Sequence, residues 1–167
     1  NELAASAAAD ALLKRFEPVA ASDAALVRLR LAQVALARVR GHAEQEQHSL
    51  CNHVCKQFLE RHRRIANLTT GLVVDAVRSN ALSAQVSALD DQVDALNDMF
   101  FCDINVLNIR LCETLLRRFI KPVLRSLLPC GRKFLSVGVS DLDVIPEREA
   151  GAQASVFVFS RLVLKLE

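Results

Sequence analysis

The sequence predicts an all-α protein, and three observations support this prediction. Leu and Ala dominate the 167 residues, whereas Gly (5) and Pro (4) are scarce and Trp and Tyr are absent. β-Sandwiches and β-barrels need frequent Gly and Pro turns and β-branched or aromatic strands, so this composition argues against them. Apolar residues also recur at intervals of three and four, the period of an amphipathic helix. The length suits one helical domain over residues 1–167 with a substantial core.

The first two predicted helices have recognisable ends. Residues 2–16 are rich in Ala, and Pro18 ends this helix. The second helix spans residues 23–40, because Ser22–Asp23 is a good N-cap and Gly41 is a good residue just past the C-terminus. Apolar side chains cover most of the circumference of the second helix, so we expect neighbours on several sides of it.

Three further segments between residues 44 and 101 have helical spacing. Residues 44–65 predict an amphipathic helix. Thr69 or Thr70 is a candidate cap for a short helix after it, and Ser79–Asn80 is expected to end that helix. Residues 86–101 then predict a separate helix with a regular apolar stripe.

The last third of the chain is predicted to contain a long helix, a long loop and a closing helix. Asp103 is a candidate cap for a helix over residues 104–128, in which Pro122 removes a backbone donor at a cost of about 3 kcal/mol or more. We therefore expect a kink there, or two helices that meet end to end. Residues 129–152 contain several Gly and Pro residues and predict a loop, partly mobile. Residues 153–166 predict a helix, with a strand as the alternative because of the VFVF run.

Six or seven helices in this length fit either an orthogonal bundle or a short solenoid of the HEAT or armadillo kind. The net charge of +2 is too balanced to predict nucleic acid as a partner. The five cysteines are odd in number and lie mostly in helical segments, so we expect a reducing compartment and no disulfide framework. No apolar run is long enough to cross a membrane. The chain lacks an initiating Met and a signal peptide, so we expect it to begin inside a longer protein.

The densest cluster of candidate metal ligands is His48, Cys51 and Cys55, at positions i, i+3 and i+7 on one helix face. With a fourth ligand, this cluster suits zinc. The paired spacings of zinc modules are absent, so we favour buried core cysteines and an exposed histidine. A cysteine nucleophile is a second alternative, but the sequence places neither a base nor an oxyanion hole beside one. We therefore predict no catalytic residue and no cofactor.

One acidic helix face precedes a basic segment. Asp90, Asp94 and Asp98 share the acidic face, where like charges four residues apart repel. The basic segment after it contains, among others, Arg110, Arg117 and Arg118. We expect these two faces to pack antiparallel and neutralise each other, in preference to a calcium or catalytic carboxylate site. The spacing of an EF-hand is absent.

A second basic cluster, Arg61, Arg63 and Arg64, lies near the end of the helix predicted over residues 44–65. We interpret it as a solvated face, with contact to anionic lipid or an acidic partner as the alternative. Aromatic residues that would stack on bases do not alternate with these arginines. Both basic clusters and the acidic face are the candidate interaction sites.

One stretch resembles a known family. Its matching positions are Leu89-Asp90, Leu96-Asn97-Asp98, Leu107-Asn108, Leu115-Leu116, Arg118, Pro122 and Leu127. This pattern resembles the later part of the FPL region of the C-type lectin domain family 16 member A proteins, known in fly as endosomal maturation defective. In that family an acidic helix with Leu-Asn-Asp leads into a long apolar helix with a proline near its end. Residues 17–40 are weakly similar to the segment that precedes this stretch in the family, residues 52–77 are similar in pattern only, and residues 155–165 resemble the apolar helix that follows a variable loop. The Ala-rich start and residues 130–152 depart from the family.

The resemblance implies an armadillo-like helical domain, not a lectin fold, in a large cytosolic protein that associates peripherally with endosomal and lysosomal membranes. Members of the family act in endosome-to-lysosome traffic and autophagy, and ubiquitin-ligase association is attributed to them without a RING motif. We therefore expect a non-enzymatic scaffold that binds trafficking or autophagy proteins. The alternatives are a ubiquitin-ligase-associated component and an all-α structural subunit of a large organellar assembly. Since a cut solenoid exposes core surface, we also expect some self-association.

Overall fold

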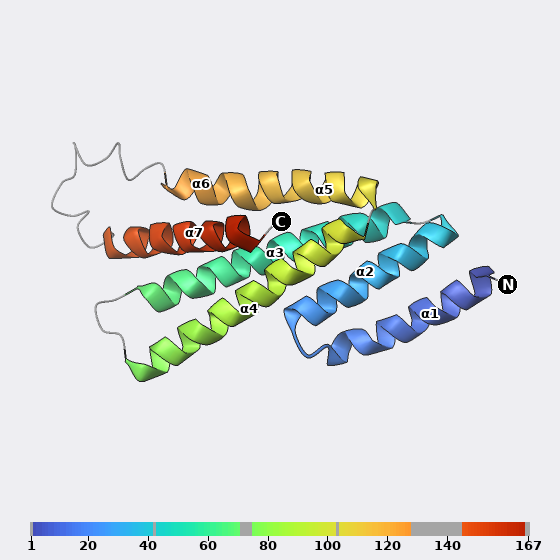
Figure 1. Ribbon diagram of the computed structural model, residues 1–167, viewed down its shortest axis with the longest axis horizontal. Coiled ribbons are helices and arrows are strands. Elements are labelled where there is room, and N and C mark those ends of the chain that lie inside the picture. The colour runs from blue at the N-terminus through green and yellow to red at the C-terminus, as the bar shows by residue number, and fades with distance from the viewer. Residues whose placement is uncertain (1, 42, 71–74, 103, 128–144, 166–167) are drawn as a thin grey trace.

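The computed structural model describes residues 2–41, 43–70, 75–102, 104–127 and 145–165, and within these ranges it contains helices and turns but no strand (Figure 1). The all-α prediction is confirmed. The elements in chain order are α1 (Glu2–Phe16), the short 3₁₀ helix η1 (Glu17–Val19), α2 (Asp23–Arg40), α3 (Ala43–Thr69), α4 (Ala76–Phe101), α5 (Asn105–Leu115), the π-helical turn η2 (Leu116–Ile120), α6 (Lys121–Leu127) and α7 (Ile145–Lys165).

The helices lie beside one another in a stack with α3 at its centre. Figure 1 shows α1 along one edge of the stack and α5 with α6 along the opposite edge. Helix α3 packs against α2, α4, α5 and α7, and α2 packs against α1, α3 and α4. The prediction that α2 has neighbours on several sides is confirmed. Because α3 packs against both α2 and α5, its position is fixed from two sides, and so are the side chains on its surface.

The predicted ends of α2 are confirmed. The Ser22 hydroxyl accepts a hydrogen bond from the backbone N–H of Ala25 at 3.1 Å. At the other end, Gly41 has a φ of 78°, a left-handed conformation that glycine adopts without steric cost. Its N–H donates to the carbonyl of Arg38, and this is the αL cap that the sequence indicates.

The expected break at Ser79–Asn80 is wrong, because α4 runs without interruption from Ala76 to Phe101. Its cap is Asp75, whose carboxylate accepts from the N–H of Arg78 at 2.6 Å. The Ser79 N–H donates to the Asp75 carbonyl in the first turn, so both break residues lie inside a capped helix.

Thr69 and Thr70 end α3 instead of starting a new helix. Their hydroxyls donate to the last carbonyls of α3, Thr69 to Ile65 at 3.1 Å and Thr70 to Ala66 at 2.7 Å. Of the short helix predicted after them, residues 71–74 lie outside the described residues, and its last residues, from Ala76, form the first turn of α4. Asp103, the expected cap of the next helix, also lies outside them, and Ile104 occupies the N-cap position of α5.

Of the two effects expected around Pro122, the second is found: α5 ends at Leu115, and the turn η2 joins it end to end with α6, which begins at Lys121. The π-helical turn η2 immediately precedes it, with the Lys121 N–H bonded to the carbonyl of Leu116, and in Figure 1 α5 and α6 run on in one line. The buried stripe explains why a wider turn fits here. Leu107, Leu111, Leu115, Phe119 and Val123 repeat every four residues, and each such step rotates about 40° around a regular α-helix. The π-helical turn η2 has more residues per turn than an α-helix, so it cancels part of this rotation and keeps the stripe facing the core.

Residues 153–165 are helical as predicted, within α7. The predicted loop over residues 129–152 is wrong in its last part, because α7 already begins at Ile145. Pro146 lies in the first turn of α7, where a missing N–H costs no helical hydrogen bond. Residues 128–144, the rest of the predicted loop, lie outside the described residues.

The core contains one aromatic cluster that joins three parts of the stack. The Phe119 ring from η2 lies 5.5 Å from the Phe58 ring of α3 and 6.3 Å from the Phe159 ring of α7, between centroids. Phe58 and Phe119 are fully buried. Helix α5, the turn η2 and helix α6 follow one another as one continuous rod, and these contacts hold that rod against the stack.

Candidate functional site

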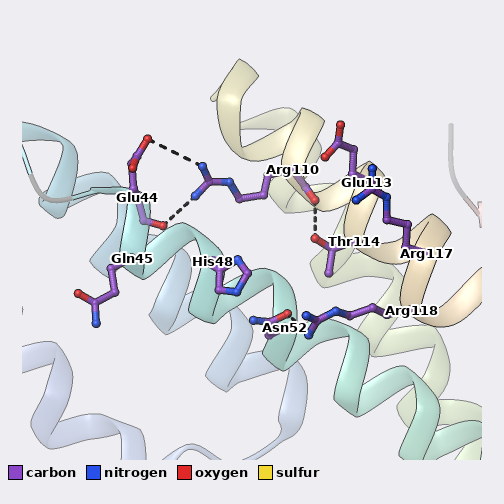
Figure 2. Close-up of a pocket in the computed structure, with 9 residues that line it drawn as sticks. All are labelled: Glu44, Gln45, His48, Asn52, Arg110, Glu113, Thr114, Arg117 and Arg118. Atoms are coloured by element: carbon purple, nitrogen blue, oxygen red, sulfur yellow. Dashed lines mark hydrogen bonds and ion pairs between the residues drawn. The ribbon is translucent and has the colours of Figure 1, made fainter.

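A polar groove of about 620 Å³ lies between the first half of α3 and the rod of α5 and η2 (Figure 2). Its α3 side is formed by residues on one face of the helix: Glu44, Gln45, His48 and Asn52. Its other side is formed by Arg110, Glu113, Thr114, Arg117 and Arg118. The groove therefore contains all three arginines that the sequence analysis names on the basic segment.

Arg110 joins the two sides of the groove. Its Nη1 donates to the backbone carbonyl of Glu44 at 2.8 Å, while its Nη2 lies 3.9 Å from the Glu44 carboxylate (Figure 2). The Glu44 side chain is 91% exposed, so water screens this ion pair. The Thr114 hydroxyl donates to the Arg110 carbonyl at 2.6 Å and orients the same turn of α5.

The other two arginines have no carboxylate partner. The Arg118 Nη1 donates to the neutral amide oxygen of Asn52 at 2.6 Å. Among the described residues, neither Arg117 nor Arg118 has a carboxylate oxygen within 4 Å, in contrast to Arg28 and Arg161 elsewhere on the surface. The groove thus presents guanidinium groups whose charge the described residues leave largely unneutralised.

An apolar face continues from this groove over the outer side of α5. Val106, Ile109 and Leu116 lie there and are 57%, 63% and 45% exposed. Their spacing of three and seven residues places them on one side of the helix, opposite the buried stripe of Leu107 and Leu111. This face was not predicted, although its spacing of three and seven residues can be recognised in the sequence.

The acidic face of α4 is paired with cations, but not with those that the sequence suggested. Asp90 lies 3.5 Å from Arg161 and 3.8 Å from Lys165, and Asp94 lies 3.3 Å from Lys165. Asp98 pairs with Arg28 of α2 at 2.6 Å. The cations therefore come from α7 and α2, and the expected antiparallel pairing with the basic segment is wrong, because α5 packs on α3 instead.

The second basic cluster is divided by the fold. Arg61 is only 6% exposed, and its guanidinium bonds to the Asp23 carboxylate at 2.7 Å and the Gln85 amide oxygen at 2.6 Å. This side chain joins α2, α3 and α4, so the expectation that it lies on a solvated face is wrong. Arg64 is exposed and pairs with Glu60 of its own helix at 3.1 Å, and Arg63 is exposed.

The three candidate metal ligands do not converge. Cys51 and Cys55 are 0% and 2% exposed in the core, whereas His48 is exposed and lines the groove. Burial raises the pKa of the Cys51 thiol to about 11 and that of Cys55 to about 12, so both thiols stay protonated. Within the described ranges, no group of three His, Cys, Asp or Glu side chains is placed to hold a metal ion.

A half-buried histidine links α3 to α7. The Ser155 hydroxyl donates to the carbonyl of Gly151 at 2.8 Å, so its oxygen accepts from the His62 Nε2–H at the same distance. Burial lowers the pKa of His62. The ring is therefore held neutral at the contact between the two helices.

Comparisons with family models, with curated proteins and with solved structures found no match to this chain. No helix among the described residues is long and apolar enough to cross a membrane. The groove between α3 and α5, with the apolar face beside it, is the candidate interaction surface.

Proposed function

We propose that the protein is a non-enzymatic helical scaffold that binds other proteins in endosome-to-lysosome traffic and autophagy. The observation that supports this most directly is the groove between α3 and α5, where Arg110, Arg117 and Arg118 line an open surface on rigid helices. Interaction sites of this kind need side chains that are held in place yet open to a partner. The resemblance to the C-type lectin domain family 16 member A proteins supplies the cellular setting of the proposal.

The positions that resemble that family have structural roles in this chain. Leu89, Leu96 and Leu107 are buried in the core. The Asn97 side chain donates to the Lys165 carbonyl at the end of α7, at 2.7 Å, and the Asn108 side chain donates to the Phe100 carbonyl at the end of α4. Such residues specify how helices stack, so the resemblance supports a shared architecture and leaves partner choice to the surface.

Burial argues against two of the thiols, Cys51 and Cys55, as nucleophiles, whereas Cys102 and Cys112 are exposed. A cysteine nucleophile must be a thiolate that a substrate can reach. Cys51 and Cys55 meet neither condition, because they are buried and their pKa values are raised to about 11 and about 12. A ubiquitin-ligase-associated component that transfers ubiquitin through a cysteine would need Cys102 or another thiol. If Cys102→Ser abolished ubiquitin transfer in a reconstituted reaction, that alternative would replace the scaffold.

Proximity labelling in cells that naturally contain the protein tests the proposed setting. The chain is fused to a biotin ligase, and the matched control is the same fusion with Phe119→Ala, which disrupts the core contact between η2 and α3. The proposal expects endosomal, lysosomal and autophagy proteins among the neighbours of the native chain, and their loss in the control. Neighbours drawn from one stable organellar complex would instead favour an all-α structural subunit.

A further inference from the structure

We infer that the groove between α3 and α5, together with the apolar face of α5, binds an acidic amphipathic helix of a partner protein. The inference rests on the proposed function as a protein-binding scaffold, and it adds the chemistry of the partner. Three properties of the surface lead to it: the charge of the groove, the apolar residues beside it and the spacing of its arginines.

The charge of the groove is complementary to acidic groups on a partner. Among the residues that the structure describes, Arg117 has no ion pair and the side chain of Arg118 bonds to the neutral side chain of Asn52. Arg110 has one carboxylate nearby, from Glu44 at 3.9 Å, and that side chain is 91% exposed. Arginine is suited to this role because its planar guanidinium binds a carboxylate through two parallel hydrogen bonds.

The apolar residues beside the groove favour a helix as the bound structure. Val106, Ile109 and Leu116 expose 57%, 63% and 45% of their surface on the outer side of α5. A partner helix that lies along α5 would cover these three side chains with its own apolar face, in the manner of a helix bound in a groove. Its acidic flank would then face the arginines. An extended acidic tail would leave the apolar residues uncovered.

The spacing of the arginines indicates where the partner's acidic residues lie. Eight residues separate Arg110 from Arg118, which is about 12 Å along a helix axis. Two carboxylates that are seven or eight residues apart on a partner helix span about the same distance. We therefore expect partner helices with Asp or Glu at this spacing on one flank and Leu, Ile or Val beside it.

The same surface fits an anionic membrane less well. Glu44 and Glu113 also line the groove, and a uniformly anionic bilayer would be repelled by both carboxylates. A discrete helix can avoid that repulsion, because it can place Lys or Arg opposite each of them. The mixed charge pattern is therefore the observation that favours a protein partner over lipid.

Fluorescence anisotropy with a designed probe tests the inference. The probe is a labelled helical peptide with Leu on one face and Glu residues two turns apart on the flank. We expect it to bind the full chain, more weakly at high salt, and we expect its Gln-substituted version to bind about tenfold or more weakly. Arg117→Glu should also weaken binding about tenfold without changing the helical circular dichroism, because Arg117 is exposed and takes part in none of the hydrogen bonds or ion pairs of the described residues. Ile109→Asp should have a similar effect.

The matched control is Arg63→Glu, which reverses an exposed arginine on α3 outside the groove and should leave binding unchanged. Equal binding of the Glu and Gln peptides, or an equal loss in Arg63→Glu and Arg117→Glu, would overturn the inference. Binding to phosphatidylserine vesicles without binding to the peptide would also overturn it in favour of lipid. A chain that fails to bind the peptide but keeps its endosomal neighbours in cells would refute this inference alone. Peptide binding without those neighbours would refute only the proposed setting.

Discussion

Replacing Phe119 with Ala should destabilise the fold more than any surface change, because this ring holds the rod of α5 and α6 against the stack. Phe119 is 0% exposed and lies between the rings of Phe58 and Phe159, with centroid distances of 5.5 and 6.3 Å. Removing a fully buried Phe side chain typically costs 3–5 kcal/mol, about 4 kcal/mol here, since two of its neighbours are rings that cannot easily close the cavity.

Urea unfolding followed by far-ultraviolet circular dichroism measures this cost, because the chain has no Trp or Tyr to report by fluorescence. With a slope of about 2 kcal/mol per molar urea, a loss of about 4 kcal/mol lowers the midpoint by about 2 M. Phe119→Leu should cost less, about 1–2 kcal/mol, and stays measurable if the Ala variant fails to fold. Phe101→Ala is the control, because that ring is 75% exposed and should change stability by less than about 0.5 kcal/mol.

The result that refutes this reasoning is a Phe119→Ala midpoint close to that of Phe101→Ala. It would mean that η2 and α6 do not pack on α3 through this cluster, and that the π-helical turn has another cause than the register of the buried stripe.

Three further predictions concern protonation and exposed apolar surface. Burial lowers the folded-state pKa of His62 below 6.5, so the unfolded chain binds its proton more strongly. The unfolding midpoint should therefore decrease as the pH falls below about 6.5, and His62→Gln should remove part of this decrease. If the midpoint fell equally steeply with pH in the native chain and in His62→Gln, the contact of His62 with α7 would be contradicted. Cys51 and Cys55 should react with an alkylating reagent only as fast as the chain unfolds, as mass spectrometry of the modified peptides would show, and immediate reaction would contradict their burial. Light scattering should detect self-association at high concentration, because Leu12 and Phe16 of α1 are 54% and 56% exposed, and a strict monomer would exclude it.

Local patterns predicted the helices and several of their ends. Ser22 and Gly41 were predictable because each satisfies backbone groups of its own helix, so no other element decides the outcome. The break at Ser79–Asn80 was mispredicted from residue preference alone, which the cap at Asp75 outweighs. The π-helical turn was predictable in principle, since a stripe that repeats every four residues does not stay on one face of a regular helix.

The candidate site was predictable only in part, because charge complementarity does not say which helices are neighbours. The sequence placed Asp90 opposite the basic segment, and the fold pairs it with Arg161 of α7. Arg61 lies three residues after Phe58 and four before Ile65, on the buried face of α3, where it meets Asp23 of α2. Grouping it with Arg63 by charge alone overlooked this spacing. The groove forms where α3 and α5 meet. Its arginines were recognisable in the sequence as a cluster, but the α3 residues that lie opposite them were not.

Apart from Arg118, the groove is lined by residues other than those that resemble the family. This separation means that the fold and the surface proposed to bind a partner depend on different residues. Leu107 and Asn108 specify the position of α5 through burial and a cross-helix hydrogen bond. Arg110 and Arg117 follow on the same helix but face the groove. A related chain could therefore keep the stack and exchange the arginines. If the groove binds a partner helix as proposed, such an exchange changes the partner without changing the fold. The proposed function is therefore tested at the groove residues, and the architecture is tested at the buried stripe.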